Sequence, residues 1–468
     1  MADFPTALDT AAAIRRREVS PLEVLEATLD RVDRHNPALN AVVWRNDDEA
    51  REEARRLGAR LAAGVGELPP FAGVPIPIKD LSPVAGWPVT YGSRGAPEGP
   101  STEDEVAVGR LRRAGFVLTG RTNTPEFGTL TVTENLRFGV TRNPWDLERT
   151  SGGSSGGASA ALASGMFSVV HASDGGGSIR IPASCCGLVG LKPTRGRVAS
   201  LVPSWQGMST QGVLTHTVAD AAALLDVLSV PDPDAWLHAP TPPWPFTDEP
   251  DSDPGPLRVA VNTVSALGLE VDAEAVAAVE RTARLLEEAG HSVVVLDGDV
   301  FDPSAVEPFL NVVNAGVAEY DDIDWSAVEP HNRAGLAAAQ AVDSVTFARS
   351  LQLLRRAART LVARFREEFD LLLTPTMAIE PPRVGVLQHS HASPGFPPLE
   401  VLGMVAFCSV FNISGQPAVS LPVHQSTVTG LPVGVQLVAG PWEEGRLLRV
   451  AAQLERAAPW AGRHPDLG

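Results

Sequence analysis

Lysine is almost absent from this chain of 468 residues, in which only Lys79 and Lys192 carry a primary side-chain amine. All the other basic residues among the 38 are arginines, so arginine supplies the ordinary surface charge. Arginine keeps its proton in proteins, whereas a buried lysine can be shifted toward neutrality and act as a base. Both lysines are therefore candidate bases. Drift in composition explains their scarcity equally well, and only their neighbours can decide between the two explanations.

Cysteine is also scarce, and Cys185, Cys186 and Cys408 provide neither a disulfide framework nor the spacing of a zinc site. His389 and His391 have no cysteine or carboxylate at ligand spacing, and we interpret them as loop residues. We therefore expect no bound metal and a reducing, cytoplasmic environment.

The chain also lacks long apolar runs and an excess of positive charge. No uninterrupted apolar run reaches the roughly 20 residues that a membrane helix needs, and the first residues contain no stretch typical of a signal peptide. The formal net charge of -18 argues against nucleic acid or an anionic membrane surface as the main partner.

Strands and helices alternate along most of the sequence, which predicts an α/β fold with its chemistry at the ends of strands. Ser20-Pro21-Leu22-Glu23 has the serine, proline and glutamate of a capped helix start. Further on, segments 257–261, 273–289 and 292–296 are expected to form a strand, a helix and a second strand.

Turn-forming residues predict the connections. Gly430–Gly434 is expected to be a turn or loop, and the proline- and aspartate-rich segment 231–256 is expected to be a surface connection. Because this segment has the character of a surface loop and not of a domain break, we expect residues 1–468 to form one domain.

Serine and glycine concentrate in two stretches, Ser151–Gly157 and Asp174–Arg180. The first has the composition of a flexible linker, but an alanine-rich helix is expected to follow it at once, which disfavours that interpretation. Glycines in such places allow close backbone approach and expose N–H groups toward a bound anion. The second stretch would therefore suit an oxyanion hole, formed by the N–H groups of Gly175, Gly176, Gly177 and Ser178.

A different interpretation of the first stretch remains open. Gly152–Gly156 fits the G-x-S-x-G nucleophile elbow of α/β-hydrolases, which would make Ser154 the nucleophile of an esterase. That fold needs a hydrophobic strand before the elbow, and Asn143–Thr150 is not one. It also needs a late histidine, for which His424 is the best candidate.

Two long motifs, Gly152–Ala163 and Asp174–Ala183, are accompanied by shorter motifs along the chain. The shorter ones are Gly73–Asp80, Gly120–Phe127, Thr141–Trp145, Gly187–Thr194, Leu373–Thr376, Asn412–Pro417 and Gly430–Gln436. Together they make the chain resemble the amidase signature family of serine hydrolases. The resemblance is loose over 231–365, where we expect substrate-cleft and lid elements within the single domain.

The resemblance implies the amidase signature fold, in which helices cover both faces of a central, mixed, mostly parallel twisted β-sheet. It also implies a Ser-cisSer-Lys triad, with Ser178 as nucleophile, Ser154 as bridging cis-serine and Lys79 as base. A serine hydroxyl is a poor nucleophile unless a neighbour takes its proton. Neutral Lys79 would draw the proton of Ser178 through Ser154, so we expect burial to move its pKa from about 10.4 toward neutrality.

By the same resemblance, Asp174 and Arg180 support the nucleophile loop and Ser155 lies behind the reacting groups. Lys192 lies in a motif whose role in the family looks structural. Gly175 stands where the family often has isoleucine or threonine, and it adds backbone freedom at the oxyanion loop.

Substrate-binding residues are expected beside the acyl-binding cleft, at Phe127, Gly128 and Thr129. Further candidate pocket walls, for which ordinary core packing is the alternative, are Trp205, Phe309, Asn314, Tyr320 and Trp325.

The activity that the resemblance implies is hydrolysis of carboxamide C–N bonds, without a cofactor. Small apolar or aryl amides are the expected substrates, with esters and carbamates as further candidates because all share a tetrahedral intermediate. We expect a monomer or homodimer with no nucleic-acid or membrane partner. The alternative is the catalytic subunit of a tRNA-dependent amidotransferase. The tyrosine-containing stretch usual in that subunit is absent from Arg197–Met208, which favours a stand-alone enzyme.

Overall fold

The computed structural model describes residues 4–64, 67–97, 99–298, 300–386 and 398–467, so His389 and His391 lie outside the described residues. In this part of the chain the largest sheet has eight strands. In spatial order they are β12 (Ser292–Val295), β11 (Arg258–Val261), β13 (Leu371–Pro375), β15 (Pro432–Ala439), β14 (Ala418–Gln425), β9 (Val189–Lys192), β10 (Thr210–Thr215) and β8 (Val170–Asp174).

The sheet is mixed, as expected, but the expectation that it is mostly parallel is wrong. Only β12 with β11 and β11 with β13 pair in parallel. The other neighbours in this sheet pair antiparallel. Helix α8 (Ala273–Glu288) provides the long crossover that the parallel pair β11 and β12 requires. In contrast, β14 and β15 are joined by a short turn, which can connect only antiparallel strands.

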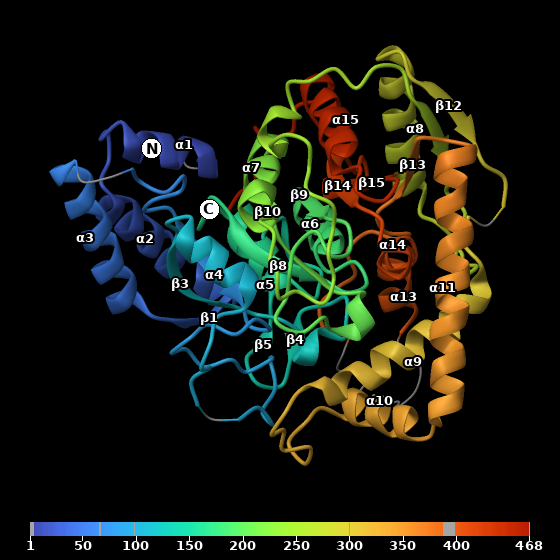
Figure 1. The fold of residues 1–468 in the computed structure, drawn as a ribbon, viewed down its shortest axis with the longest axis horizontal. Helices are drawn as coiled ribbons and strands as arrows, with labels where there is room; N and C mark the ends of the chain where they lie inside the picture. The colour runs from blue at the N-terminus through green and yellow to red at the C-terminus, as the bar shows by residue number, and fades with distance from the viewer. Residues whose placement is uncertain (1–3, 65–66, 98, 299, 387–397, 468) are drawn as a thin grey trace.

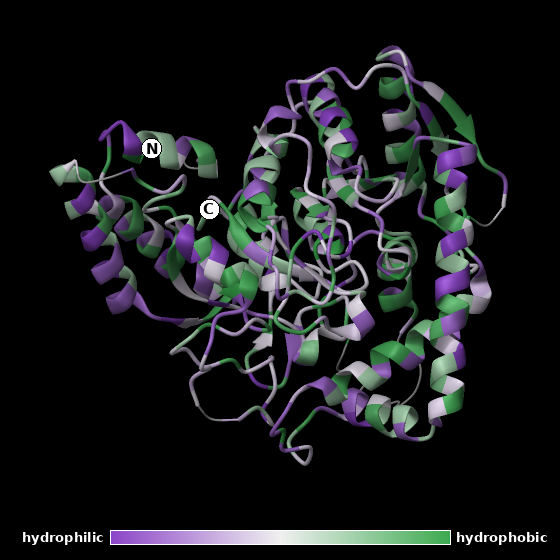
Figure 2. Cartoon of the chain, viewed as in Figure 1, coloured by the Kyte–Doolittle hydropathy of each residue, from purple (hydrophilic) through white to green (hydrophobic). Residues whose placement is uncertain are grey.

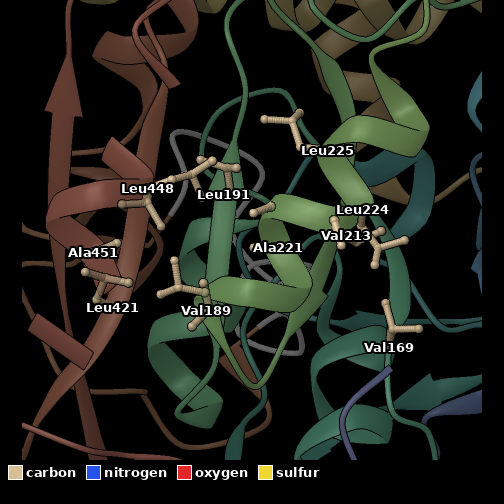
Figure 3. Packing of buried hydrophobic residues seen from close by; sticks show 14 of the residues in the cluster. Val169, Val189, Leu191, Val213, Ala221, Leu224, Leu225, Leu421, Leu448 and Ala451 are labelled. Carbon is tan, nitrogen blue, oxygen red and sulfur yellow. The ribbon is translucent and has the colours of Figure 1, made fainter. Parts of the chain in front are cut away.

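One face of the sheet packs against a helical layer. Alternate residues of the strands, such as Val189 and Leu191 of β9, belong to one buried apolar cluster, as the period of two along a strand requires. Figure 3 shows these side chains between α7 (Val218–Leu228) and α15 (Glu444–Ala457). Each fully buried Val or Leu stabilises such a layer by about 1.5–3 kcal/mol.

The opposite face of the same strands carries the intervening residues, among them Gly190, Lys192 and Gln436. Helix α6 (Arg180–Cys186) lies directly on this face. A Cβ atom on Gly190 would lie only 2.6 Å from the Cβ of Ala183, so glycine is what permits this approach. Helices therefore cover both faces, and the second serine and glycine stretch, which precedes α6, lies over the sheet.

A smaller sheet stands beside β8. Its strands are β1 (Val42–Arg45), β3 (Val117–Thr122) and β2 (Pro75–Lys79), with β2 and β3 parallel. The helices of this part, at the left of Figure 1, are α1 (Ala7–Arg15), α2 (Pro21–Leu39), α3 (Asp47–Ala63) and α4 (Val106–Arg113). The fully buried helix α5 (Gly156–Ala163) packs against β8 and α6. It thereby connects the small sheet with the large one.

The loosely matched region is mainly helical and lies at the other side of the molecule. It contains α9 (Val306–Gly316), α10 (Pro330–Gln340) and the long α11 (Ser344–Glu367), followed later by α13 (Leu399–Val405) and α14 (Ser409–Ser414). Purple and green alternate along α11 in Figure 2, as expected for an amphipathic helix with one face against a core. No helix of the described residues combines the length and the apolar character needed to span a bilayer.

Short strands complete the path between the small sheet and α5. They are β4 (Glu134–Asn135), β5 (Gly139–Val140), β6 (Arg142–Asn143) and β7 (Asp146–Thr150), paired β4 with β5 and β6 with β7.

Several local predictions are confirmed. Ser20 and Glu23 form the reciprocal capping box at the start of α2. The expected strand, helix and strand between 257 and 296 are β11, α8 and β12. The expected loop Gly430–Gly434 is only partly a loop, because β15 already begins at Pro432, which pairs with Gln425 of β14.

The close packing at the start of α5 predicts that Gly157→Ala lowers stability. A Cβ there would lie 2.3 Å from Asn123 N and 2.6 Å from Ala41 O, which are both backbone atoms. Overpacking of this kind costs about 1–3 kcal/mol or more, so the Tm measured by calorimetry should fall. Gly462→Ala is the control, since no atom lies within 4 Å of its Cβ position. An equal Tm for the two variants would contradict this account of the packing.

Candidate active site

Lys79, the last residue of β2, meets two serine hydroxyls inside the protein. Its Nζ lies 2.7 Å from Ser154 Oγ and 3.0 Å from Ser173 Oγ. Ser154 lies in the loop between β7 and α5, after a cis peptide bond from Gly153, and Ser173 lies near the end of β8. Lys79 is 0% exposed and Ser154 is 2% exposed. The structure therefore brings two of the three predicted catalytic residues into direct contact.

Burial lowers the pKa of Lys79 to about 7, because the ammonium form loses its hydration there. The negative charge of Asp174 opposes this shift but does not cancel it. Near neutral pH a large fraction of Lys79 is therefore the free amine, which can accept a proton from Ser154.

Ser178 lies on the loop between β8 and α6 and is 8% exposed. Among the described residues, no hydrogen bond joins its hydroxyl to Ser154 or to Lys79. The contact between the bridging serine and the predicted nucleophile thus stays a prediction.

The glycines before Ser178 do not all have free N–H groups. The N–H of Gly177 donates to Asp174 Oδ1 at 2.8 Å, so the expectation that it points at an oxyanion is wrong in this structure. The carboxylate of Asp174 is the nearer anion and takes this donor. Among the described residues, the N–H groups of Gly175, Gly176 and Ser178 donate to no protein acceptor. Gly175 and Gly176 are also partly exposed, as a substrate-facing backbone requires.

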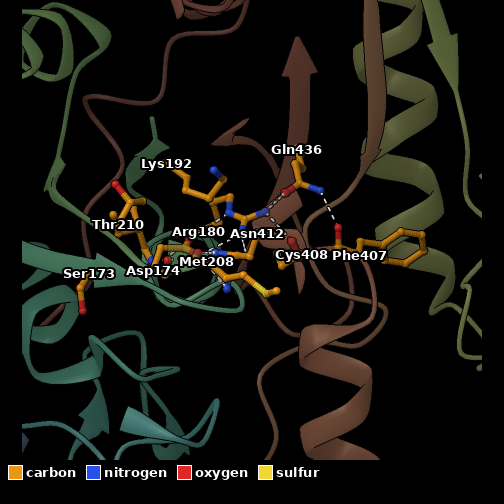
Figure 4. Close-up of polar contacts among 12 residues, drawn as sticks. Ser173, Asp174, Arg180, Lys192, Met208, Thr210, Phe407, Cys408, Asn412 and Gln436 are labelled. Atoms are coloured by element: carbon orange, nitrogen blue, oxygen red, sulfur yellow. Dashed lines mark hydrogen bonds and ion pairs between the residues drawn. The ribbon is translucent and has the colours of Figure 1, made fainter. Parts of the chain in front are cut away.

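A buried ion pair holds this loop. Arg180 donates to both carboxylate oxygens of Asp174, each at 2.9 Å, and both residues are fully buried. Arg180 also donates to Gln436 Oε1, Asn412 Oδ1 and the carbonyl of Cys408. Figure 4 shows these groups converging on the guanidinium from β15 and from α14 with the loop before it. The network ties the start of α6 to two distant parts of the chain.

Asp174 remains ionised in this network. Burial alone would raise its pKa, but the charge of Arg180 and the hydrogen bonds from Arg180 and Asn412 hold that pKa well below its usual range. Its negative charge is therefore shared mainly with Arg180. Asp174 and Arg180 are in contact with each other at the start of α6, and their supporting role stays a prediction.

Lys192, the second lysine, lies close to the same network but has a different environment. Burial and the charge of Arg180 lower its pKa to about 7 as well. Its Nζ donates to the carbonyl of Pro193 at 2.9 Å. Low pKa alone therefore does not separate the two lysines. The contact with the hydroxyl of Ser154 distinguishes Lys79 from Lys192.

Ser155 and Ser173 brace the two stretches against each other. Ser155 Oγ donates to the carbonyl of Ser173 at 3.2 Å, and its predicted position behind the reacting groups stays a prediction. Ser173 itself was not predicted as a site residue. Neither glycine stretch indicates that Ser173, directly before Asp174, lies next to Lys79. This becomes apparent only from the structure, in which β8 lies beside β2.

The predicted substrate-binding residues form a tight turn beside Ser154. A Cβ on Gly128 would lie 3.3 Å from Ser154 Oγ, so this part of the turn abuts the bridging serine. Phe127 is 1% exposed, and its ring stacks on Tyr320 with centroids 4.9 Å apart and also contacts Trp325. Thr129 Oγ1 donates to Asn332 Oδ1 at 2.8 Å. Of these residues, Gly128 is the one at which an added side chain would contact the candidate catalytic group.

The nucleophile-elbow alternative finds no support in this geometry. The strand before Ser154, β7, belongs to a two-stranded sheet with β6 and not to the central sheet. His424 pairs with Glu274 of α8 at 2.8 Å, and the hydroxyl of Ser154 contacts Lys79 instead. Within the described ranges, no group of three or more His, Cys, Asp or Glu side chains is placed to hold a metal ion.

Comparison with known proteins gives the family. The family model described as Amidase matches residues 23–448. The 6-aminohexanoate-cyclic-dimer hydrolase of Pseudomonas sp. strain NK87 is 39% identical over 98% of this chain and 95% of its own length. The acylamidase of Rhodococcus erythropolis is 33% identical over 98% of this chain and 97% of its own. A structure of 6-aminohexanoate cyclic dimer hydrolase complexed with substrate covers 100% of both chains, with 36% identity and a TM-score of 0.93.

The chain therefore belongs to the amidase signature family. It is an amidase, a hydrolase of amide C–N bonds. This confirms the family, the α/β fold class and the kind of enzyme that the motifs predicted.

The ion pair at the start of α6 predicts a large effect of Arg180→Lys on stability. A lysine cannot reproduce the two-pronged contact with Asp174 and the further bonds to Gln436 and Asn412. Each buried acceptor left without its hydrogen bond costs about 1–3 kcal/mol, so the Tm should fall strongly. Arg364→Lys, in a partly exposed pair with Glu368, is the control and should cost at most about 0.5 kcal/mol. Similar Tm changes for both variants would disprove the structural importance of the buried pair.

Proposed function

We propose that this amidase cleaves carboxamides through an acyl-enzyme on Ser178, with Ser154 as the bridging serine and Lys79 as the base. The observation that carries the proposal is the 2.7 Å contact between Lys79 Nζ and Ser154 Oγ, whose side chains are both buried. A lysine whose pKa is near 7 is matched to proton transfer at neutral pH.

The proposed reaction uses these residues in the following order. Ser178 Oγ attacks the carbonyl carbon while its proton passes to Ser154, whose own proton passes to Lys79. The N–H groups of Gly175, Gly176 and Ser178 receive the developing oxyanion. The C–N bond breaks as Lys79 returns a proton through Ser154 to the leaving amine. Water attacks the acyl-enzyme by the same proton route, which releases the carboxylic acid and restores Ser178.

Small apolar or aryl amides are the substrates that the surroundings favour. Phe309 of α9 and Val405 of α13 are the side chains nearest the Cβ position of Gly176, at 3.8 and 4.0 Å. Both are partly exposed, so they offer an apolar wall beside the oxyanion loop. The names of the acylamidase and cyclic-dimer hydrolase relatives agree with an amide substrate. Esters and carbamates pass through the same kind of intermediate and are further candidates.

We infer a stand-alone enzyme, as a monomer or homodimer in the cytoplasm, that needs no cofactor. The absence of the amidotransferase stretch from Arg197–Met208 supports this, as do whole-length relatives that are named as hydrolases. Region 231–365 would supply substrate-cleft elements, because Phe309 comes from it. Activity of the purified chain without a partner is the result that separates this proposal from an amidotransferase subunit.

Lys79→Arg tests the base. The arginine keeps a positive charge and similar bulk but cannot lose its proton, so kcat should fall by about 10⁴-fold or more. For the unchanged chain, kcat/KM should rise as the pH increases through about 7 and level off above it, since protonated Lys79 cannot accept a proton. Lys192→Arg is the matched control and should retain this pH profile. Amide turnover by Lys79→Arg would show that another group is the base.

A substrate panel tests the reaction and the apolar wall together. The purified chain should hydrolyse anilides and other apolar amides, with Ser178→Ala as the inactive blank. Phe309→Ala should lower kcat/KM for anilides by about 10- to 100-fold and leave the smallest primary amides almost unaffected. Phe347→Ala, a partly buried phenylalanine of α11, is the control. An equal loss for large and small amides would contradict the wall assigned to Phe309.

A further inference from the structure

The turn beside Ser154 is held from outside by the loosely matched region. Glu126, at its start, accepts the N–H of Glu329 at 2.9 Å and the side-chain amide of Asn332 at 2.8 Å, both on Oε2. At its next residue, the carbonyl of Phe127 accepts the hydroxyl of Tyr320 at 3.3 Å. The motif residues therefore depend for their position on residues 320–332, in addition to Ser93 and Tyr91, which bind Glu126 Oε1 and the Phe127 N–H.

Asn332 is the residue that contacts both ends of this turn. Its Nδ2 donates to the carboxylate of Glu126 and to the Glu126 carbonyl, at 2.8 and 3.2 Å. Its Oδ1 accepts the hydroxyl of Thr129 at 2.8 Å. Asn332 is 2% exposed, so water cannot replace these bonds. Only a side chain with a donor on one side and an acceptor on the other satisfies both ends.

A displacement of the turn would reach the candidate catalytic groups directly. Phe127 and Gly128 both have left-handed backbone, with φ of 55° and 69°, which makes the turn sharp. A Cβ on Gly128 would lie 2.6 Å from Leu81 Cδ1 and 3.3 Å from Ser154 Oγ, so there is no spare room between the turn and the bridging serine. Ser154 in turn contacts Lys79.

We propose that Asn332 is a positioning residue of the active site, which keeps the turn 126–129 against Ser154 and thereby sets the geometry of proton transfer. This inference rests on the proposed function. According to this proposal, the loosely matched region affects kcat as well as the choice of substrate.

Asn332→Asp tests the proposal because it keeps the shape and removes the donor. The new carboxylate would face Glu126, whose pKa burial already raises. Protonation of the new carboxyl group would restore a donor toward Glu126. Other charged groups near this point affect the same titration, and they are Glu329, Glu134, His331, Arg333 and Arg94.

The experiment compares kcat and KM of the unchanged chain, Asn332→Asp and Asn262→Asp on one hydrolysed amide across a range of pH. Above neutral pH, Asn332→Asp should lower kcat by about 10- to 100-fold, the size expected for a misplaced catalytic group. KM should change by less than about threefold. The ratio of its kcat to that of the unchanged chain should rise as the pH falls. Asn262, equally buried with its Nδ2 on the carbonyl of Gly298, is the matched control and should show no such pH-dependent ratio.

Thr129 provides a second test that does not depend on how well Asn332→Asp folds. Thr129→Val removes the hydroxyl that donates to Asn332 Oδ1, and it should lower kcat more than Thr129→Ser, which keeps a hydroxyl there. A change in KM alone would mean that the turn only contacts substrate, and a ratio of kcat independent of pH would mean general destabilisation. Either result overturns the proposal. Inactivity of the unchanged chain toward every amide would instead disprove the proposed function.

Discussion

The burial of Lys79 is the constraint on which the rest of the site depends. Its amine is removed from water and is in contact with two serine hydroxyls instead of a carboxylate. The nearby negative charge, Asp174, is bound on both oxygens by Arg180. Because that charge is already neutralised, it stabilises the ammonium form of Lys79 only partly. The ion pair and the buried lysine are therefore two parts of one electrostatic arrangement.

Strand ends of the two sheets and the surrounding helices contribute different parts of this arrangement. The ends of β2 and β8 hold Lys79 and Asp174, and α6 carries Arg180 onto the face of the sheet opposite the main apolar core. The region of loose resemblance packs around this centre. It supplies Phe309 near Gly176 and Asn332 at the turn beside Ser154. In our account the first contact affects substrate choice and the second affects the rate of proton transfer.

Local sequence patterns correctly predicted the structural features that depend on interactions between residues close in the sequence. The capping box at Ser20 and Glu23 forms because its atoms lie within one helical turn. Strand direction was predicted less well, because it depends on which distant strands become neighbours. The pairing of β14 with β9, for example, joins segments more than 200 residues apart. The mostly antiparallel sheet could not be derived from helix and strand periodicity alone.

Prediction of the site from the sequence is limited in the same way. The motifs identified Lys79 and Ser154, but Ser173 and Asn332 became visible only from contacts between separate segments. The hydrogen bond from the Gly177 N–H to Asp174 could not be predicted either, because three consecutive glycines look alike in the sequence. Lysine scarcity pointed to Lys79 and to Lys192 together. Only the neighbours of each amine distinguish them, because burial shifts both pKa values to about 7.

The most direct test of the central claim is to locate the nucleophile with a fluorophosphonate probe and peptide mapping by mass spectrometry. The account predicts a covalent adduct on Ser178 that forms faster as the pH rises through about 7, following the deprotonation of Lys79. An adduct on Ser154, or a labelling rate that does not depend on Lys79, would contradict it.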